Sequence, residues 1–536
     1  MNVESMTIDG LVRRMAINAP AKRAVVSAQV SLTYEELDRE VRRLALGLIE
    51  VGLEKGDRVA ILFLNDPNFL ICYFAVLRCG GVVVPLNTRL VADEVAYQIS
   101  HSDSRLILHG DEFDDMLDSV GSRPPWSRRV SPTGRADGAM TLAQVARLGD
   151  DVAEPVFPSV HHDDAAGIWY TSGTTGTPKG AIVTHASSLW SAIGMALTGG
   201  VTARSRLLAP APLFHRGPME TLSLAGFLVG ATHFLLPKFD PADLLDSIER
   251  HAITHAFIVP SMTFAVLNLP QRGDYDLTSV TCWLTASASF PEEYRDRLEA
   301  ETTLRSGMII NAYGITESLL NACFDPASLE GHRGSVGSAV PGTLIRVLDS
   351  HRAPMPAGEI GEIAVSGASI AAGYIDNDEA WNAVTFVEDG LTWYLSGDLG
   401  YLDDDGFLYI VDRVKDMVIS GGENVYSAEV ERVLVTHPDI AEVAIIGTPD
   451  QRWGECVTAV ISSRAGAILD VEALEEYCAG RLAAYKRPRR VFHIEELPRN
   501  AFGKVRKGEV RDFVRARLVA DAGQPGAGPA VPGSTR

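Results

Sequence analysis

The sequence predicts an α/β protein with a large N-terminal domain, built on mixed, largely parallel sheets and helices, and a small α+β C-terminal domain. Over residues 1–120, helical and strand patterns alternate with short connections, which favours βαβ units and parallel strands. After Gly361 the pattern changes to short strands with Gly and Asp turns. From Glu429 onward, helical and strand patterns resume in a segment small enough to be a separate lid-like domain.

These patterns also predict where the domains begin and end. We place the large domain at residues 1–412 and the small one at residues 413–520. Residues 521–536 contain Gly, Pro, Ala and Ser with almost no large apolar side chain, so we expect a disordered tail there. Residues 121–138 are rich in Pro, Arg, Gly and Ser, which predicts a surface excursion of the large domain.

Individual helices and strands are predicted from the periodicity of apolar residues and from residues typical of helix ends. Thr33 and Glu36 have the spacing of a capping box, apolar residues then recur at helical spacing, and Gly52 ends that helix. The same reasoning predicts helices at residues 67–78, with Pro in the first turn, and at residues 240–251. Short apolar runs predict strands at residues 58–64, 82–84, 106–108, 181–184, 256–259 and 280–284.

The charge balance excludes a broad class of partners. The chain has 48 basic and 69 acidic residues, which gives a formal charge of −21. Such a chain has no general affinity for nucleic acid or for an anionic membrane, so a local arrangement must hold any anionic ligand. No apolar run reaches the ~18 residues of a spanning helix, and no signal peptide is visible. The six cysteines form no C-x-x-C pair, so we expect reduced thiols in a cytoplasmic protein.

The sharpest local feature is the segment Tyr170-Thr171-Ser172-Gly173-Thr174-Thr175-Gly176-Thr177-Pro178-Lys179-Gly180. Its glycines let backbone N–H groups turn inward, its hydroxyls add donors and Lys179 adds a positive charge, a combination that suits a polyphosphate. It is not a Walker A loop, because Gly180 follows Lys179 where that motif has Ser or Thr. A flexible hairpin loop without a ligand is the alternative interpretation.

With this segment in place, the chain resembles the adenylate-forming enzymes, which include acyl-CoA synthetases, carrier-loading adenylation domains and firefly luciferases. The segment is similar to their phosphate-binding signature, and the resemblance spans residues 33–511. It implies a multi-lobed N-terminal domain and a mobile C-terminal domain. The family's other motifs follow in order: Pro212-Leu213-Phe214-His215, Tyr313-Gly314-Ile315-Thr316-Glu317, Tyr394-Leu395-Ser396-Gly397-Asp398, Asp412-Arg413-Val414-Lys415-Asp416, Gly421-Gly422-Glu423-Asn424 and Pro498-Arg499-Asn500-Ala501-Phe502-Gly503-Lys504.

The resemblance implies a site for ATP and Mg²⁺. Glu317, a hard oxygen ligand of the kind Mg²⁺ takes beside phosphates, would bind the metal, while Thr316 would donate to the α-phosphate. The ring of Tyr313 would face adenine. Asp398 would accept both ribose hydroxyls, and Arg413 would reach the same sugar. The other residues implied in binding ATP are Thr171, Ser172, Gly173, Thr174, Thr175, Lys179, Ser287, Ala288, Asn311, Ala312 and Gly314.

Two of these residues have a plain structural alternative. Glu317 could be a solvated carboxylate at the start of a helix, and Asp398 could be a turn residue after Gly397. The family's frequent Gly-Gly-Ala-Pro segment near adenine reads Ala286-Ser287-Ala288-Ser289 here, which leaves the shape of the acid pocket open.

The C-terminal motifs resemble the moving parts of the family. Lys504 matches its mobile catalytic lysine, whose ammonium would bridge the attacking carboxylate and the α-phosphate in the transition state. Membership of the solvated basic run that follows it is the alternative. Lys415 matches the hinge of the C-terminal domain. Gly421, Gly422 and Glu423 match the loop that faces the pantetheine arm of CoA, with an ordinary turn as the alternative.

The acid pocket is implied by the pair that follows Phe214. His215 matches the residue that gates this pocket in many acyl-CoA synthetases, although a lone histidine is often structural. Arg216 lies near the position where amino-acid-activating domains carry Asp, so an α-amino acid substrate is disfavoured. If Arg216 faces the pocket, acids with a second anionic or strongly polar group should have a higher kcat/KM than plain aliphatic acids. Otherwise it is a solvated residue loosely paired with Glu220.

We therefore predict an AMP-forming acid–CoA ligase that uses ATP, Mg²⁺ and CoA. One alternative is an adenylation enzyme that passes the acyl group to a carrier-protein thiol or an amine. A catalytically silent nucleotide-binding protein is another, disfavoured because Glu317, Asp398, Arg413 and Lys504 are all present. The sequence does not identify the carboxylic acid, and it leaves a homodimer open. We expect no nucleic acid partner and no integral membrane segment.

Overall fold

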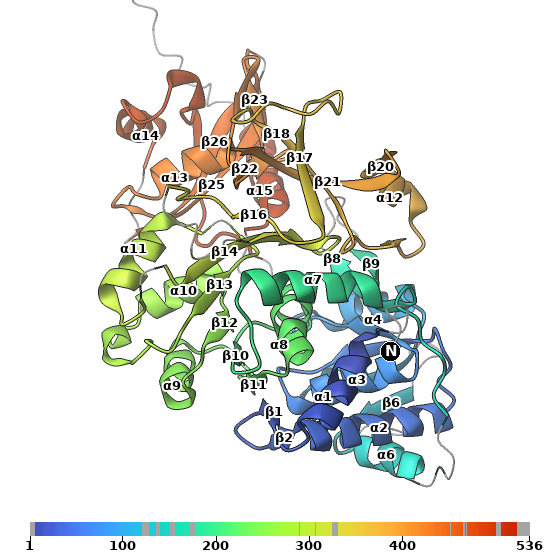
Figure 1. Ribbon diagram of the computed structural model, residues 1–536. Coiled ribbons are helices and arrows are strands. Elements are labelled where there is room, and N and C mark those ends of the chain that lie inside the picture. Colours follow the sequence, from blue (N-terminus) through green and yellow to red (C-terminus); the bar gives the residue numbers. More distant parts are fainter. Residues whose placement is uncertain are drawn as a thin grey trace, which may run out of the picture. The chain divides into compact units, whose positions relative to one another are not determined.

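Alternating helices and strands build two large sheets in the N-terminal part of the computed structural model (Figure 1). The structure describes residues 6–120, 128–135, 140–150, 152, 156–171, 178–288, 290–305, 307–323, 331–450, 452–464, 467, 469–499 and 505–522. The chain divides into two units. The first comprises residues 1–359, 363–396 and 402–409, and the second comprises residues 360–362, 397–401 and 410–536.

The first sheet carries the two strands on either side of the predicted phosphate loop. Its order is β19 (Gly373–Tyr374), β9 (Lys179–Thr184), β8 (Ala165–Thr171), β4 (Val82–Pro85), β3 (Arg58–Leu62), β5 (Ser104–His109), β6 (Arg128–Ser131) and β7 (Met140–Thr141). The strands from β8 to β7 pair in parallel, whereas β9 pairs antiparallel with both β8 and β19. The helices of this region are α1 (Ile8–Asn18), α2 (Tyr34–Glu50), α3 (Pro67–Arg78), α4 (Ala92–His101), α5 (Asp114–Asp118) and α6 (Leu142–Asp150).

The second sheet carries the predicted adenine and metal motif at one edge. Its order is β16 (Ser338–Ala339), β15 (Leu319–Cys323), β14 (Ile309–Ile315), β13 (Cys282–Thr285), β12 (His255–Phe257), β10 (Arg206–Ala209), β11 (Thr232–Leu235), β1 (Arg23–Val26) and β2 (Ser31–Thr33). The strands from β14 to β1 pair in parallel. Figure 1 shows helices on both sides of these strands: α7 (His185–Thr198) and α8 (Leu224–Val229) on one, α9 (Pro241–His251), α10 (Pro260–Leu267) and α11 (Glu292–Glu301) on the other.

Two smaller sheets complete the fold. One has the order β17 (Thr343–Leu348), β18 (Gly361–Gly367), β21 (Leu391–Leu402) and β20 (Thr385–Glu388), with β22 (Leu408–Arg413) beside β21 and α12 (Asp378–Ala383) near β20. The second unit contains β24 (Glu423–Val425), β23 (Val418–Ser420), β26 (Gly454–Ser463) and β25 (Ile440–Asp450), with β27 (Arg490–His493) beside β26. Its helices are α13 (Ser427–Leu434), α14 (Val471–Cys478) and α15 (Lys507–Ala522).

The predicted α/β fold class is confirmed, and so are several element ends. Thr33 Oγ1 accepts from the Glu36 N–H at 3.2 Å, and Glu36 Oε2 accepts from the Thr33 N–H at 2.8 Å, which is the predicted capping box. Gly52 follows that helix with a φ of +90°. The helix predicted at 67–78 is α3, the one predicted at 240–251 is α9, and the strand predicted at 181–184 is β9.

Two predictions are wrong in part. Within the predicted surface excursion at 121–138, residues 128–131 form β6, which pairs with β5 and buries Val130 and Ser131. The short Arg-Arg-Val-Ser run has only one large apolar residue, so periodicity gives no strand signal. The expected disordered tail also begins too early, because α15 extends to Ala522; residues 523–536 lie outside the described part of the chain. In that described part, no helix has the length and apolar character needed to cross a bilayer.

Candidate active site

A tight turn between β14 and β15 carries Thr316 and Glu317. Gly314 makes this turn possible, because a Cβ there would lie 1.6 Å from the carbonyl oxygen of Leu319. Leu319 adopts a φ of +57°, in the left-handed region. Glu317 is therefore a buried carboxylate at a strand reversal, 8% exposed, and the alternative of a solvated residue at a helix start is wrong.

Tyr374 holds the Glu317 carboxylate, and Tyr394 lies beside Tyr374. The O–H of Tyr374 donates to Glu317 Oε1 at 2.6 Å, and the hydroxyls of Tyr374 and Tyr394 lie 3.2 Å apart. Burial and the charge of Glu317 raise the pKa of both phenols above their usual range, so both keep their protons at physiological pH. Among the described residues, no hydrogen bond to Glu317 Oε2 is made.

Lys179 lies over the ring of Tyr374. Its Nζ is 5.2 Å from the centre of the Tyr374 ring, within the range of a cation–π contact. The pairing of β19 with β9 brings the two together, because Tyr374 lies opposite Ala181. Thr171 lies directly opposite Lys179 in the β8–β9 pair, so both ends of the predicted phosphate loop leave the same sheet edge. Ser172, Gly173, Thr174 and Thr175 lie outside the described residues.

The residues implied in adenine binding gather at the carboxyl end of β13 and beside it in β14, where the parallel pairing of the two strands ends. Thr285, the last residue of β13, lies opposite Asn311 in β14. Ser287 and Ala288 follow β13 and are exposed, whereas Asn311, Ala312 and Tyr313 are at most 9% exposed. Carboxyl ends of parallel strands are the usual ligand-binding edge of an α/β sheet. Ser289 lies outside the described residues.

Asn65 holds the segment that leads to His215. Its Nδ2 donates to the carbonyls of Ala209 and Ala211 at 2.8 and 2.9 Å, and its Oδ1 accepts from the Leu213 N–H at 2.8 Å. The side chain is 5% exposed. Sequence reasoning missed this residue; the available signal was a polar Asn-Asp-Pro-Asn run inside an apolar stretch.

His215 is half-buried and electrically neutral. Burial, with the positive charge of Arg89 in addition, holds the pKa of the imidazole well below its usual range. Its ring lies 4.6 Å from that of Phe214. A neutral imidazole offers one donor and one acceptor and does not attract a second anion.

Arg216 is paired with Glu220, as one of its predicted alternatives states, but it is buried rather than solvated. Its Nε donates to Glu220 Oε2 at 2.6 Å, and the two side chains are 2% and 0% exposed. Sequence spacing predicted the pair because the residues are four apart, whereas their burial depends on α7 and β15. Contact between Arg216 and the acid stays a prediction.

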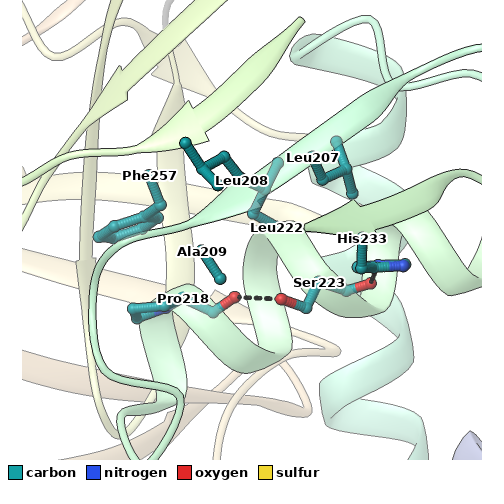
Figure 2. Close-up of a pocket in the computed structure, with 8 residues that line it drawn as sticks. All are labelled: Leu207, Leu208, Ala209, Pro218, Leu222, Ser223, His233 and Phe257. Carbon is teal, nitrogen blue, oxygen red and sulfur yellow. Dashed lines mark hydrogen bonds between the residues drawn. The ribbon is translucent and has the colours of Figure 1, made fainter. Parts of the chain in front are cut away.

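A small pocket lies beside the turn of helix that follows Arg216 (Figure 2). This element, η3 (Gly217–Ser223), is π-helical. Such helices are rare, and those that occur often lie at functional sites. Ser223 Oγ donates to the Pro218 carbonyl at 3.0 Å, and the Ser223 carbonyl lies 2.9 Å from His233 Nε2. The wall is otherwise apolar, and its residues are Leu207, Leu208, Ala209, Pro218, Leu222, Ser223, His233 and Phe257.

In the second unit, the two residues implied in ribose binding form an ion pair. Arg413 Nε lies 3.0 Å from Asp398 Oδ1, and Asp398 is 5% exposed. Asp398 lies inside β21, so the alternative of a turn residue is wrong. Near the predicted hinge, Arg511 Nη2 donates to the Lys415 carbonyl at 3.1 Å and pairs with Asp416 at 2.8 Å.

The exposed glycine pair of the second unit packs on a tryptophan between two arginines. Gly421 and Gly422 have φ values of +65° and +86°, and a Cβ on Gly421 would lie 2.9 Å from the Trp453 ring. The guanidinium carbons of Arg452 and Arg489 lie 4.7 and 4.3 Å from the centre of that ring. Sequence reasoning missed this group, because its members come from distant parts of the chain. Glu423 begins β24 and is exposed.

The site residues fit Mg²⁺ held largely by substrate. Among the described residues, no group of three or more His, Cys, Asp or Glu side chains could hold a metal ion alone. Mg²⁺ commonly binds through one or two carboxylates together with phosphate oxygens and water. The single buried carboxylate of Glu317 suits that arrangement. Lys504 lies outside the described residues, and its role stays a prediction.

Comparison with known proteins gives the family. The model of the family described as AMP-binding enzyme matches residues 12–375, and that of the AMP-binding enzyme C-terminal domain matches residues 429–504. A feruloyl-CoA synthase from Amycolatopsis is 37% identical over 93% of this chain and 97% of its own. An indoleacetate–CoA ligase from Aromatoleum aromaticum is 35% identical over 95% and 98%. The crystal structure of ATP-bound MatB from Rhodopseudomonas palustris superimposes with a TM-score of 0.84, at 30% identity over 95% and 99%.

These matches cover both units, and the resemblance to the adenylate-forming enzymes is confirmed. The chain therefore belongs to the AMP-binding enzyme family, and within it to the AMP-forming acyl-CoA synthetases.

Proposed function

We propose that this enzyme activates an aromatic or arylalkyl carboxylic acid with MgATP and then transfers the acyl group to the thiol of CoA. The observation that carries the first step is the cluster of Glu317, Tyr374 and Lys179 beside the strands of the predicted phosphate loop. A buried carboxylate and an ammonium group next to a loop of backbone and hydroxyl donors suit a metal-bound polyphosphate.

In the first half-reaction, a carboxylate oxygen of the acid attacks the α-phosphorus of ATP and pyrophosphate leaves. Both reactants are anions, so positive charge must offset their repulsion. Lys179 would hold the outer phosphates, Thr316 would donate to the α-phosphate, and Lys504 would stabilise the charge that develops during transfer. When bound by Glu317, Mg²⁺ would supply further positive charge beside the departing pyrophosphate.

The remaining nucleotide contacts would hold the sugar and the base. Asp398 would accept the two ribose hydroxyls, with Arg413 beside it. The ring of Tyr313, together with Ser287 after β13 and Asn311 in β14, would enclose adenine. Holding ATP in one orientation leaves the α-phosphorus open to in-line attack, and such positioning is a large part of catalysis of phosphoryl and adenylyl transfer.

Three observations support an aromatic acid without a second charge. The Arg216 guanidinium already forms an ion pair with the Glu220 carboxylate. His215 is neutral and does not attract a second anion. Two similar proteins are named for feruloyl and indoleacetate groups, both aromatic acids. A dianionic acid would need a further cation, and neither Arg216 nor His215 provides one.

In the second half-reaction, the acceptor thiol attacks the acyl carbon and AMP leaves. Free CoA carries an anionic nucleotide end, whereas pantetheine attached to a carrier protein does not. Arg452 and Arg489 beside Gly421 would bind that anionic end through charge-assisted contacts. We therefore favour CoA over a carrier protein or an amine.

A panel of carboxylic acids tests the reaction and the acid class together. We expect AMP and pyrophosphate as products, a CoA thioester by mass spectrometry, and the highest kcat/KM for aromatic and arylalkyl acids. ADP as the nucleotide product would contradict the adenylation step. Activation without CoA that never yields a CoA thioester would favour the carrier or amine alternative, and a preference for plain aliphatic acids would contradict the acid class.

Glu317→Gln tests metal binding, because the amide oxygen still accepts from Tyr374 while the charge is lost. We expect acid-dependent ATP–pyrophosphate exchange to fall on the order of 10²-fold. Calorimetry should show that ATP binding becomes less dependent on Mg²⁺. Glu379→Gln, at an exposed position of α12, is the matched control and should behave as wild type. Unchanged Mg²⁺ dependence in Glu317→Gln would contradict the assignment of Glu317 as the metal ligand.

Lys504→Ala and Lys415→Pro should affect opposite half-reactions. Lys504→Ala should reduce acyl-AMP formation by orders of magnitude, each tenfold loss equalling ~1.4 kcal/mol of transition-state stabilisation. It should still convert pre-made acyl-AMP and CoA to thioester. Lys415→Pro should do the reverse, because a fixed φ hinders hinge rotation while leaving the first site assembled. Equal loss of both half-reactions in both variants would contradict the hinge mechanism.

Arg489→Ala tests whether the second unit recognises the nucleotide end of CoA. We expect the KM for CoA to rise about tenfold, which corresponds to ~1.4 kcal/mol, while the KM for pantetheine stays unchanged. Arg432→Ala, at an exposed arginine of the same unit, is the control. A rise in KM for both thiols would instead indicate that Arg489 supports the thiol end, through its contacts with Trp453 and Ser420.

A further inference from the structure

A buried ion pair lies in the segment that follows β10, and its arginine also contacts the turn that carries Glu317. Arg216 Nε and Glu220 Oε2 lie 2.6 Å apart in the protein interior. Glu220 Oε2 also accepts from Ser188 Oγ at 2.8 Å, and Glu220 Oε1 accepts from the Tyr73 O–H at 3.1 Å. Both oxygens of this buried carboxylate therefore have donors, as a buried charge requires.

The guanidinium reaches beyond this pair. Its Nη2 donates to Ser187 Oγ at 3.4 Å, within α7. Its Nη1 donates to the carbonyl oxygen of Thr316, a residue distant in the sequence and directly before Glu317. Arg216 thus joins the start of η3 to the β14–β15 turn through one rigid, planar side chain.

Stability alone does not account for this arrangement. Replacing a buried ion pair with packed apolar residues is often neutral or stabilising, because both charges lose their hydration. What the pair provides is a donor at a fixed place. On its other side the turn is held as well, because the Glu317 carbonyl accepts from the Ala371 N–H at 2.6 Å. The two carbonyls of the turn are therefore held by two different elements.

We propose that Arg216 is a positioning residue for the adenylation half-reaction: by holding the Thr316 carbonyl, it sets the place of the turn that presents Thr316 and Glu317 to MgATP. This inference rests on the proposed function, in which that turn contacts the nucleotide. Because Arg216 directly follows His215, the same side chain connects the segment that faces the acid with the turn that faces ATP. Arg216 touches neither substrate in this role.

Arg216→Lys is the sharpest variant, because it keeps the buried charge beside Glu220 but loses the planar fork. A single ammonium group cannot reach Glu220, Ser187 and the Thr316 carbonyl in the same geometry. We expect kcat/KM for acyl-AMP formation to fall on the order of 10²-fold, as displacement of a catalytic group by about 1 Å does. The dissociation constant of MgATP, measured by calorimetry, should rise. Thioester formation from pre-made acyl-AMP and the ranking of acids should stay unchanged.

Tyr73→Phe is the matched control, because it removes a hydrogen bond at the far end of the same network and leaves the contact with Thr316. It should lower the melting temperature and keep near wild-type adenylation. Glu220→Gln, which keeps the acceptor for Arg216 Nε but removes the charge, should show a smaller adenylation defect than Arg216→Lys. Circular dichroism and melting temperatures establish that each variant is folded, and Glu220→Gln replaces Arg216→Lys in the comparison if the latter does not fold.

The outcomes separate this inference from the proposed function. If the wild-type enzyme shows no Mg²⁺-dependent ATP–pyrophosphate exchange with any acid, the proposed function fails whatever the variants do. If exchange occurs but Arg216→Lys leaves adenylation intact, or impairs both half-reactions equally, Arg216 does not position the turn. Tyr73→Phe matching Arg216→Lys in adenylation would show a general effect of the network. A changed ranking of acids without a change in MgATP binding would place Arg216 in the acid pocket instead.

Discussion

The narrow reversal between β14 and β15 is the constraint on which the nucleotide-binding part of the first unit depends. The turn is so tight that a side chain at position 314 would collide with the Leu319 carbonyl, and only glycine fits there. The turn buries the Glu317 carboxylate. In the interior, a carboxylate is costly unless donors replace its water. Tyr374 supplies the donor, and its ring in turn lies beside Lys179. Backbone geometry and electrostatics therefore act together at this turn.

The site must bind anionic ligands within a chain of formal charge −21. We propose that local arrangements of positive charge achieve this, because the overall field does not favour anions. Lys179 starts a strand at the edge from which the phosphate segment leaves, and Arg452 and Arg489 flank Trp453 beside the glycine pair. In contrast, Arg216 is neutralised by Glu220 and adds no net charge to its surroundings. In the proposed function, arginine therefore serves ligand recognition at one place and positioning at another, according to whether a buried acid lies beside it.

Much of the fold and of the candidate site was predictable from short stretches of sequence. The capping box at Thr33, the helix at 67–78 and the pairing of Arg216 with Glu220 depend on residues within a few positions of one another. Local composition predicted a loop that contains Thr171 and Lys179, and the family resemblance implied that Asp398 and Arg413 serve one ligand group. The structure brings each pair of residues together. The strand β6 was not predicted, because four residues with a single large apolar side chain show no alternation of apolar and polar residues.

What the sequence by itself determined is local geometry and chemical type: which segments are helices or strands, and which residues can bind phosphate, metal or sugar. Only the tertiary structure decided that Arg216 is buried and reaches Thr316, that Asn65 holds the approach to His215, and that Tyr374 donates to Glu317. These contacts join residues far apart along the chain. A hydrogen bond between such residues depends on the packing of whole elements, and packing is a property of the assembled core that no short window of sequence contains.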